Sequence, residues 1–151
     1  MKNNKVVLSL FDGISGMQLA LKKSKIKIDK YLASEIDENV ISITQKNFPK
    51  TIQLGDVTKI TKDMLPSHVW LLSSGSPCQD FSIAGKKQGV KTHKGKEINS
   101  LAHYLKLKKK NQKCIGHSYL IWEAIRLYKE LNPTYFFFEN VTNMSPELIA
   151  Y

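Results

Sequence analysis

Cys78 lies within the octapeptide GSPCQDFS at residues 75–82, between an apolar run at 69–72 and a polar, basic segment. A cysteine at the start of such a loop can use its thiolate as a nucleophile. A free cysteine is also among the residues most often buried as an inert small side chain. The octapeptide alone leaves both interpretations open.

Three carboxylates, Glu35, Asp56 and Glu139, each follow an apolar run that is typical of a β-strand. Acidic residues in such places can bind a ligand or take part in acid–base chemistry. The alternatives are structural: Glu35 can favour the dipole of the following helix, Asp56 can cap a helix, and Glu139 can be an ordinary strand-end acid. The elements that position these residues therefore matter.

Periodicity predicts alternating strands and helices along the chain. The predicted strands are 5–10, 28–34, 51–54, 68–72 and 134–138. One predicted helix follows residue 16, a second begins at residues 37–38 and runs to about residue 47, and a third covers 118–131, with a weak helix at 58–65. This alternation predicts an α/β fold with a doubly wound, mostly parallel sheet. Ligands of such sheets bind outside the carboxyl ends of the strands, where Cys78 and the three carboxylates fall.

The turn at residues 11–16, FDGISG, joins the first predicted strand to the first helix. Its two glycines allow a tight bend and a close ligand approach, and helix N-terminal N–H groups would face that ligand. Glu35 follows at roughly the 20-residue spacing from which an acid reaches a ribose hydroxyl. The full dinucleotide fingerprint GxGxxG is absent. A nucleotide-type site and a plain strand-to-helix turn both fit.

The chain of 151 residues has a net charge of +10 and a pI near 9.6, which indicates a polyanionic partner or a lysine-rich coding bias. Much of this charge lies in an aperiodic insertion at about 86–113, which is either solvated chain or a phosphate-contacting flap. The two cysteines make no disulfide framework, and no metal-ligand spacing occurs. The length predicts one domain, and no run approaches the roughly 20 apolar residues of a membrane span. We expect a cytoplasmic protein.

In their order, these motifs resemble the DNA cytosine-C5 methyltransferase family over almost the whole chain. The turn resembles the motif that cradles S-adenosylmethionine, which implies that its six residues bind this cofactor: Phe11, Asp12, Gly13, Ile14, Ser15 and Gly16. Glu35 matches the acid that binds the cofactor ribose, and Ile36 lies beside the adenine. Asp56, followed by Val57, matches the acid that reads the adenine amino group. The fold implied is Rossmann-like.

Pro77-Cys78 resembles the catalytic motif of this family, and Glu139-Asn140-Val141 resembles the motif whose carboxylate grips the target cytosine. The resemblance implies that Cys78 adds to C6 of cytosine and that Glu139 hydrogen-bonds N3. Carbon C5 then accepts the methyl group. The partner implied is double-stranded DNA with the target cytosine flipped out of the helix.

The sequence departs from the family pattern after residue 141. The later Arg-x-Arg motif, the target-recognition region and the final segments of the family are missing, and the lysine-rich stretch is longer than usual. We therefore expect residues 1–151 to form a partial catalytic domain, incomplete at its C-terminal side, within a split or truncated enzyme. A second chain would supply the target-recognition region. The alternatives are a non-catalytic, basic nucleic-acid-binding remnant and an RNA cytosine-C5 methyltransferase.

Overall fold

The computed structural model describes residues 4–77 and 90–141, and the chain divides into two compact units. Of the described residues, unit 1 contains 4–75 and 127–138, and unit 2 contains 76–77, 90–126 and 139–141.

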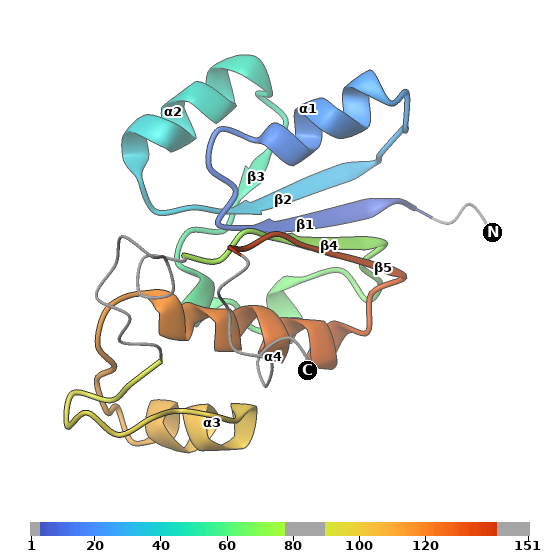
Figure 1. Cartoon of the computed structure of the whole chain (residues 1–151). Coiled ribbons are helices and arrows are strands. Elements are labelled where there is room, and N and C mark those ends of the chain that lie inside the picture. Colours follow the sequence, from blue (N-terminus) through green and yellow to red (C-terminus); the bar gives the residue numbers. More distant parts are fainter. Residues whose placement is uncertain (1–3, 78–89, 142–151) are drawn as a thin grey trace. The chain divides into compact units, whose positions relative to one another are not determined.

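Unit 1 is built on a parallel β-sheet (Figure 1). Its described strands are β1 (Val6–Leu10), β2 (Lys30–Ser34), β3 (Ile52–Gln53), β4 (Leu71–Ser74) and β5 (Tyr135–Phe138), in the order β3-β2-β1-β4-β5. Every pairing between these strands is parallel. This confirms the predicted α/β fold with a doubly wound sheet.

The central strand β1 is buried along its whole length, as expected for a parallel strand covered on both faces. The helices α1 (Gly16–Lys23) and α2 (Glu38–Asn47) lie on one side of the sheet in Figure 1. Val7 of β1 packs in a cluster with Leu21 of α1 and Tyr31 of β2. This core fixes the first turn of the chain against the sheet.

Strand β5 forms one edge of the described sheet and pairs with β4. Its side chains Tyr135, Phe136 and Phe137 are 57%, 40% and 50% exposed. Tyr128, in the last turn of α4 (Ile121–Leu131), packs against Phe136 with ring centroids 4.8 Å apart. Strand β5 therefore presents exposed aromatic side chains at this edge of the described sheet.

Two predicted elements differ from the structure. The fourth strand was expected at 68–72, but β4 runs from Leu71 to Ser74 because the buried serines Ser73 and Ser74 continue the ladder with β1. The weak helix at 58–65 is wrong: two 3-10 turns, Val57–Lys59 and Lys62–Met64, take its place. β-branched residues at 58, 60 and 61 disfavour a continuous helix there.

Unit 2 contains α3 (Leu101–Lys109), the 3-10 turn Ser118–Leu120 and residues 121–126 of α4. The helix predicted to start at residue 118 thus begins with a 3-10 turn. Residues 90–115 are hydrogen-bonded chain: the bridges Lys91–Glu97 and Thr92–Cys114 place the segment around residues 91–92 between two antiparallel neighbours. The part of the basic insertion that the structure describes, from residue 90, is therefore folded.

Candidate functional site

The topology of unit 1 places a switch point at the carboxyl ends of β1 and β4, where the strand order reverses. Leu10 is in register with Ser34 and with Ser74, so these strands end at the same level of the sheet. In open α/β sheets, ligands bind in the crevice outside such a point. The turn that follows Leu10 and the acid that follows Ser34 therefore lie at the edge where a ligand is expected.

The turn after β1 is held in left-handed backbone conformations. Phe11, Gly13 and Ser15 have φ values of 55°, 57° and 63°. Left-handed non-glycine residues cost about 1–3 kcal/mol each and tend to persist at ligand-binding sites. A Cβ built on Gly13 would meet nothing within 4 Å. Glycine therefore suits this position because of its left-handed backbone conformation and not because of crowding, and the space above the turn is open.

Asp12 stabilises this turn from within. Its carboxylate accepts a hydrogen bond from the Ser15 hydroxyl and another, at 2.6 Å, from the phenol of Tyr31. Burial, reinforced by the negative charge of Asp12, raises the pKa of Tyr31 well above its usual value. The Tyr31 phenol therefore remains a donor, and Asp12 acts as a structural anchor of the turn.

Glu35 lies against the same turn. Its Oε2 accepts a hydrogen bond from the Gly13 N–H at 3.0 Å, and its Oε1 accepts from the N–H groups of Ile36 and Asp37 at 2.8 and 3.1 Å. An ionised carboxylate offers about four acceptor positions, so one remains for a further donor. The structure thus brings together the glycine turn and the acid predicted to share a site. Ile36 beside it is 74% exposed.

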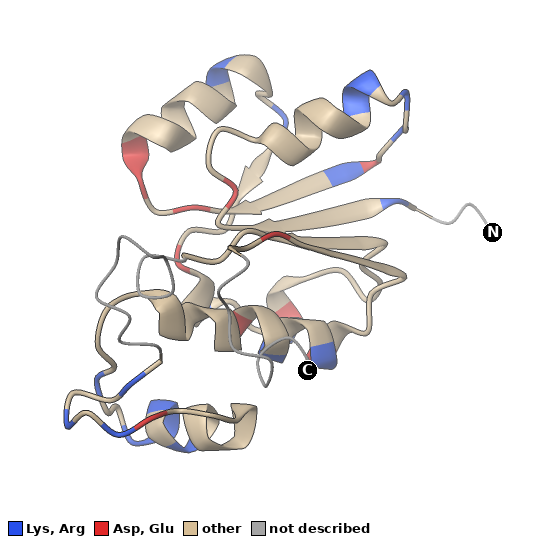
Figure 2. Ribbon diagram, viewed as in Figure 1, with Lys and Arg blue, Asp and Glu red and all other residues tan. Residues whose placement is uncertain are grey.

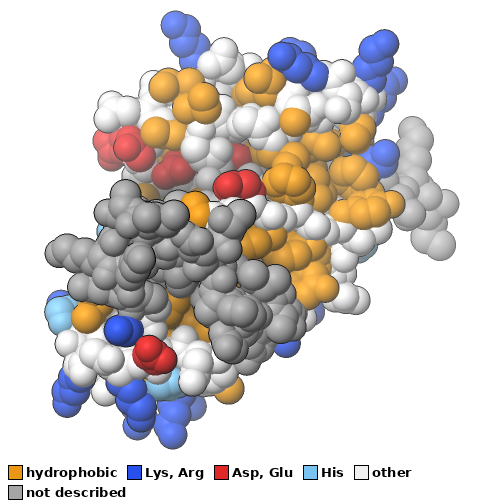
Figure 3. Space-filling model, in the orientation of Figure 1, with side chains coloured by type: hydrophobic (Ala, Val, Ile, Leu, Met, Phe, Trp, Pro, Cys, Tyr) orange, Lys and Arg blue, Asp and Glu red, His pale blue; other side chains and the backbone are white. Residues whose placement is uncertain are grey.

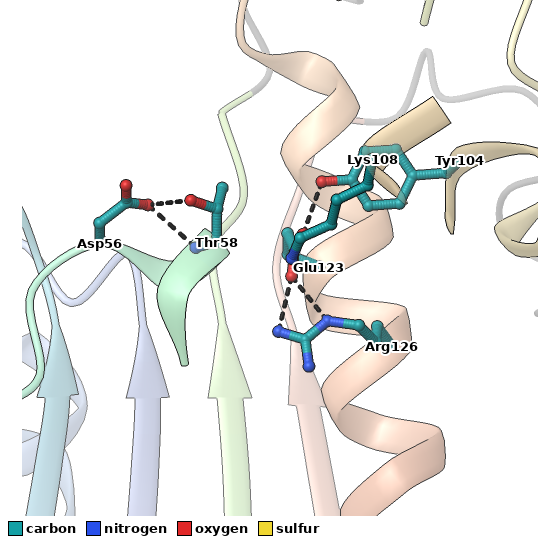
Figure 4. A network of polar contacts seen from close by, with 6 residues as sticks. All are labelled: Asp56, Thr58, Tyr104, Lys108, Glu123 and Arg126. Atoms are coloured by element: carbon teal, nitrogen blue, oxygen red, sulfur yellow. Dashed lines mark hydrogen bonds and ion pairs between the residues drawn. The ribbon is translucent and has the colours of Figure 1, made fainter. Parts of the chain in front are cut away.

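Asp56 caps the 3-10 turn Val57–Lys59, which is the structural role predicted as the alternative to ligand binding. Its Oδ1 accepts hydrogen bonds from the N–H and the hydroxyl of Thr58, at 2.9 and 2.8 Å (Figure 4). Its second carboxylate oxygen makes no hydrogen bond within the described chain. The cap and a ligand contact are therefore compatible. The neighbouring Val57 is buried.

Unit 2 joins two further motifs. The Asn140 side-chain amide donates hydrogen bonds to the backbone oxygen and the hydroxyl of Ser76, both at 2.9 Å. Ser76 is buried and Pro77 half-buried, while Glu139 is exposed. Cys78, the predicted nucleophile, lies outside the described residues. Asn140 was predicted only as part of a motif, and its contact required the structure.

Comparison with known proteins places these motifs in a family. The family model described as C-5 cytosine-specific DNA methylase matches residues 6–147, which is most of the chain. The chain belongs to this family. Predicted membership of the cytosine-C5 methyltransferases is thereby confirmed.

Individual members of the methylase family show how much of them the chain covers. The orphan methyltransferase M.Rho11sI of Bacillus phage rho11s is 33% identical over 140 residues, which are 91% of this chain and 23% of that protein. The type II methyltransferase M1.ScrFI of Lactococcus lactis is 33% identical over 138 residues, 91% of this chain and 29% of that protein. This chain spans about a quarter of the length of these relatives.

Among solved structures, a DNMT2 variant of Spodoptera frugiperda aligns with 29% identity and a TM-score of 0.47, over 55% of this chain and 26% of that one.

Of the described helices, none is long and apolar enough to cross a membrane. Likewise, residues 4–77 and 90–141 contain no group of three or more histidine, cysteine or acidic side chains able to hold a metal ion.

Proposed function

We propose that this chain binds S-adenosylmethionine at the carboxyl edge of the unit 1 sheet and carries the nucleophile for methyl transfer to C5 of cytosine in DNA. The observation that carries the proposal is the contact of Glu35 with the Gly13 N–H at the switch point of the sheet. A family match that runs through the Pro77-Cys78 and Glu139-Asn140 motifs supports the same reaction.

The residues at this edge fit the cofactor. Ser74, at the tip of β4, has a buried hydroxyl with no hydrogen-bond partner in the described chain, and the space above Gly13 is open. Such an orphaned polar group beside an open turn is accounted for by a polar ligand. Glu35 would hold the ribose hydroxyls and Asp56 the adenine amino group, with Ile36 against the adenine face. The cofactor site would be completed by the residues of the turn after β1 and by two residues of the other motifs: Phe11, Asp12, Gly13, Ile14, Ser15, Gly16, Val57 and Pro77.

S-adenosylmethionine supplies an electrophilic methyl group when bound. The protein's part is to make C5 of cytosine nucleophilic, because this carbon is unreactive in the intact aromatic ring. The Cys78 thiolate would add to C6 and form an S–C6 bond, while Glu139 would hydrogen-bond N3 and stabilise the charge that develops on the ring. After methylation, loss of the C5 proton to a base and cleavage of the S–C6 bond would restore the ring and free the thiol.

We further propose that recognition of the DNA target requires polypeptide that residues 1–151 do not contain, such as a second chain that carries the target-recognition region. The chain covers only about a quarter of its methyltransferase relatives, and β5 presents exposed aromatic side chains at the edge of the described sheet. Exposed apolar edges are typical of surfaces that pair with further polypeptide. On this account the isolated chain binds the cofactor but does not methylate DNA unaided.

Covalent trapping tests the reaction. A duplex containing 5-fluorocytosine retains the adduct, because fluorine cannot leave as the C5 proton does. The chain would be incubated with this duplex and S-adenosylmethionine, alone and with the remaining segment of a relative such as M.Rho11sI. We expect an adduct only in the mixture, and none with Cys78→Ala. An adduct with the isolated chain would contradict the need for further polypeptide, and an adduct with Cys78→Ala would exclude Cys78. A preference for 5-fluorocytosine in RNA over the same base in the duplex would overturn the DNA assignment.

A further inference from the structure

Positive charge is concentrated in the described part of the insertion. Residues 90–113 contain eight lysines and one glutamate, a net charge of +7 within a chain whose total is +10. A helix C-terminus favours lysines in its last turn, which accounts for Lys108 and Lys109 of α3. It does not account for the lysines on the preceding bridged segment. Figure 2 shows these basic positions on both α3 and the chain that precedes it.

These lysines are carried by ordered backbone. Thr92 accepts from the Gly95 N–H at 2.8 Å and donates its own N–H to the Lys96 carbonyl at 2.8 Å, which closes a tight turn. Gly95 has a φ of 76°, a conformation that glycine adopts without strain. The turn directs Lys94 and Lys96 from a fixed loop. Both side chains are exposed.

The second set of basic residues comes from α3. His103, Lys106 and Lys110 are separated by three and four residues, so they share one face of the helix. The Ser100 hydroxyl caps this helix by accepting from the His103 N–H at 3.2 Å. The turn and this helix face together line a hollow of about 700 Å³ in unit 2, to which Glu97 contributes a single carboxylate.

A buried ion cluster fixes α3 within unit 2. Glu123 of α4 is fully buried, and its carboxylate accepts hydrogen bonds from the Tyr104 phenol and Lys108 Nζ, each at 2.5 Å (Figure 4). Arg126 Nη2 lies 2.7 Å from the same carboxylate. Lys108 is thus engaged internally, while Lys94, Lys96, Lys106 and Lys110 line the hollow. Basic side chains also gather at the lower edge of the surface in Figure 3.

We propose that this hollow binds the phosphodiester backbone of duplex DNA. Four lysines and a histidine on two rigid elements face one acidic side chain, a balance that suits a line of phosphates. The proposal rests on the proposed DNA substrate and deepens it. The hollow would hold the duplex in register independently of its base sequence, since phosphate contacts position a protein without reading bases.

The test is the salt dependence of binding to a short labelled duplex, measured by fluorescence anisotropy on the full chain without S-adenosylmethionine. The quadruple variant Lys94→Gln, Lys96→Gln, Lys106→Gln, Lys110→Gln is compared with a matched variant that has Gln at Lys23, Lys27, Lys46 and Lys50, all exposed in unit 1. Each phosphate contact contributes about 0.9 to the slope of log K against log salt. In the hollow variant, which has Gln at the four lysines that line the hollow, we expect the magnitude of this slope to fall by about 3 to 4. In the matched variant we expect it to fall by less than half as much.

A charge-retaining variant with Arg at the same four positions should keep the wild-type slope. Equal losses in the two Gln variants, or no loss in the hollow variant, would overturn the proposal. A deficit seen with RNA but not with the duplex would assign the hollow to RNA, and competition by polyglutamate equal to that by DNA would assign it to an acidic protein; either result overturns it. Far-UV circular dichroism verifies folding. The binding assay contains no S-adenosylmethionine, so its result does not depend on whether the chain binds this cofactor. Failure of the proposed cofactor binding is therefore distinguished from failure of DNA binding at the hollow.

Discussion

The side-chain amide of Asn140 donates two hydrogen bonds, both of 2.9 Å, to Ser76, two positions before Cys78. The segment that carries the proposed nucleophile is thereby tied to the segment that carries the proposed cytosine-binding carboxylate, Glu139. Both segments lie within unit 2. Asn140 is a positioning residue on this account, because it acts on the reaction through Ser76.

Replacing Asn140 by Ala should slow adduct formation on 5-fluorocytosine DNA while leaving S-adenosylmethionine affinity unchanged. Two neutral hydrogen bonds of about 0.5–1.5 kcal/mol each predict a loss of roughly fivefold to 150-fold, measured in the trapping assay with the complementing segment. Ser76→Ala removes one acceptor and should have a smaller effect. Asn47→Ala is the matched control, because Asn47 also donates to a backbone oxygen but belongs to α2. Equal effects of Asn140→Ala and Asn47→Ala would contradict the positioning role.

Glu123 should be the most sensitive position for the stability of unit 2. Its replacement by Ala leaves the buried Arg126 without its carboxylate and removes the partner of Tyr104. Breaking a buried ion pair from one side typically costs about 3–5 kcal/mol. Denaturant unfolding measures the loss, with Glu38→Gln, at an exposed position in the first turn of α2, as the control. A loss below about 1 kcal/mol, as for a surface ion pair, would show that the cluster does not hold α3.

Tyr31 predicts a stability change at alkaline pH. Because burial and Asp12 raise the pKa of Tyr31, the folded protein keeps this phenol protonated where the unfolded chain releases the proton, near pH 10. The resulting stabilisation is complete below about pH 10 and is lost as pH rises further. Tyr31→Phe should therefore reduce the alkaline fall of the free energy of unfolding by up to about 1.4 kcal/mol per pH unit. An unchanged slope between the two proteins would contradict the raised pKa of Tyr31 and hence its burial beside Asp12.

Cys114 should be a poor nucleophile. Burial raises the pKa of its thiol, so a smaller fraction is thiolate at neutral pH than for an ordinary cysteine. In Cys78→Ala, where Cys114 is the remaining cysteine, alkylation by iodoacetamide should be slow at pH 7 and should accelerate only above the usual thiol pKa. The wild-type chain should show an additional fast phase from Cys78. Fast alkylation of the variant would show that the burial of Cys114 does not suppress its reactivity.

Much of the sheet could be predicted from the sequence, because parallel strands appear as short apolar runs between helices. The exceptions have physical causes. Ser73 and Ser74 look like loop residues, yet small polar side chains are tolerated in a buried ladder. Helix α3 was missed because lysines interrupt its apolar period; its signals were the cap at Ser100 and the buried pair Tyr104 and Leu107.

The candidate site could be predicted in part. The glycine turn and Glu35 were expected to share a ligand, and their contact follows from the aligned ends of β1 and β2. The structural alternative for Asp56 also holds, since one of its oxygens caps a turn. Contacts between residues far apart in the chain, such as Asn140 with Ser76, leave no local pattern and required the three-dimensional structure.

Calorimetric titration of the folded chain with S-adenosylmethionine tests the central claim most directly. We predict one binding site that persists in Cys78→Ala and is lost in Glu35→Ala, because Glu35 supports the Gly13 turn and would hold the ribose. Absence of binding to the folded wild-type chain, or binding that is unchanged in Glu35→Ala, would contradict it.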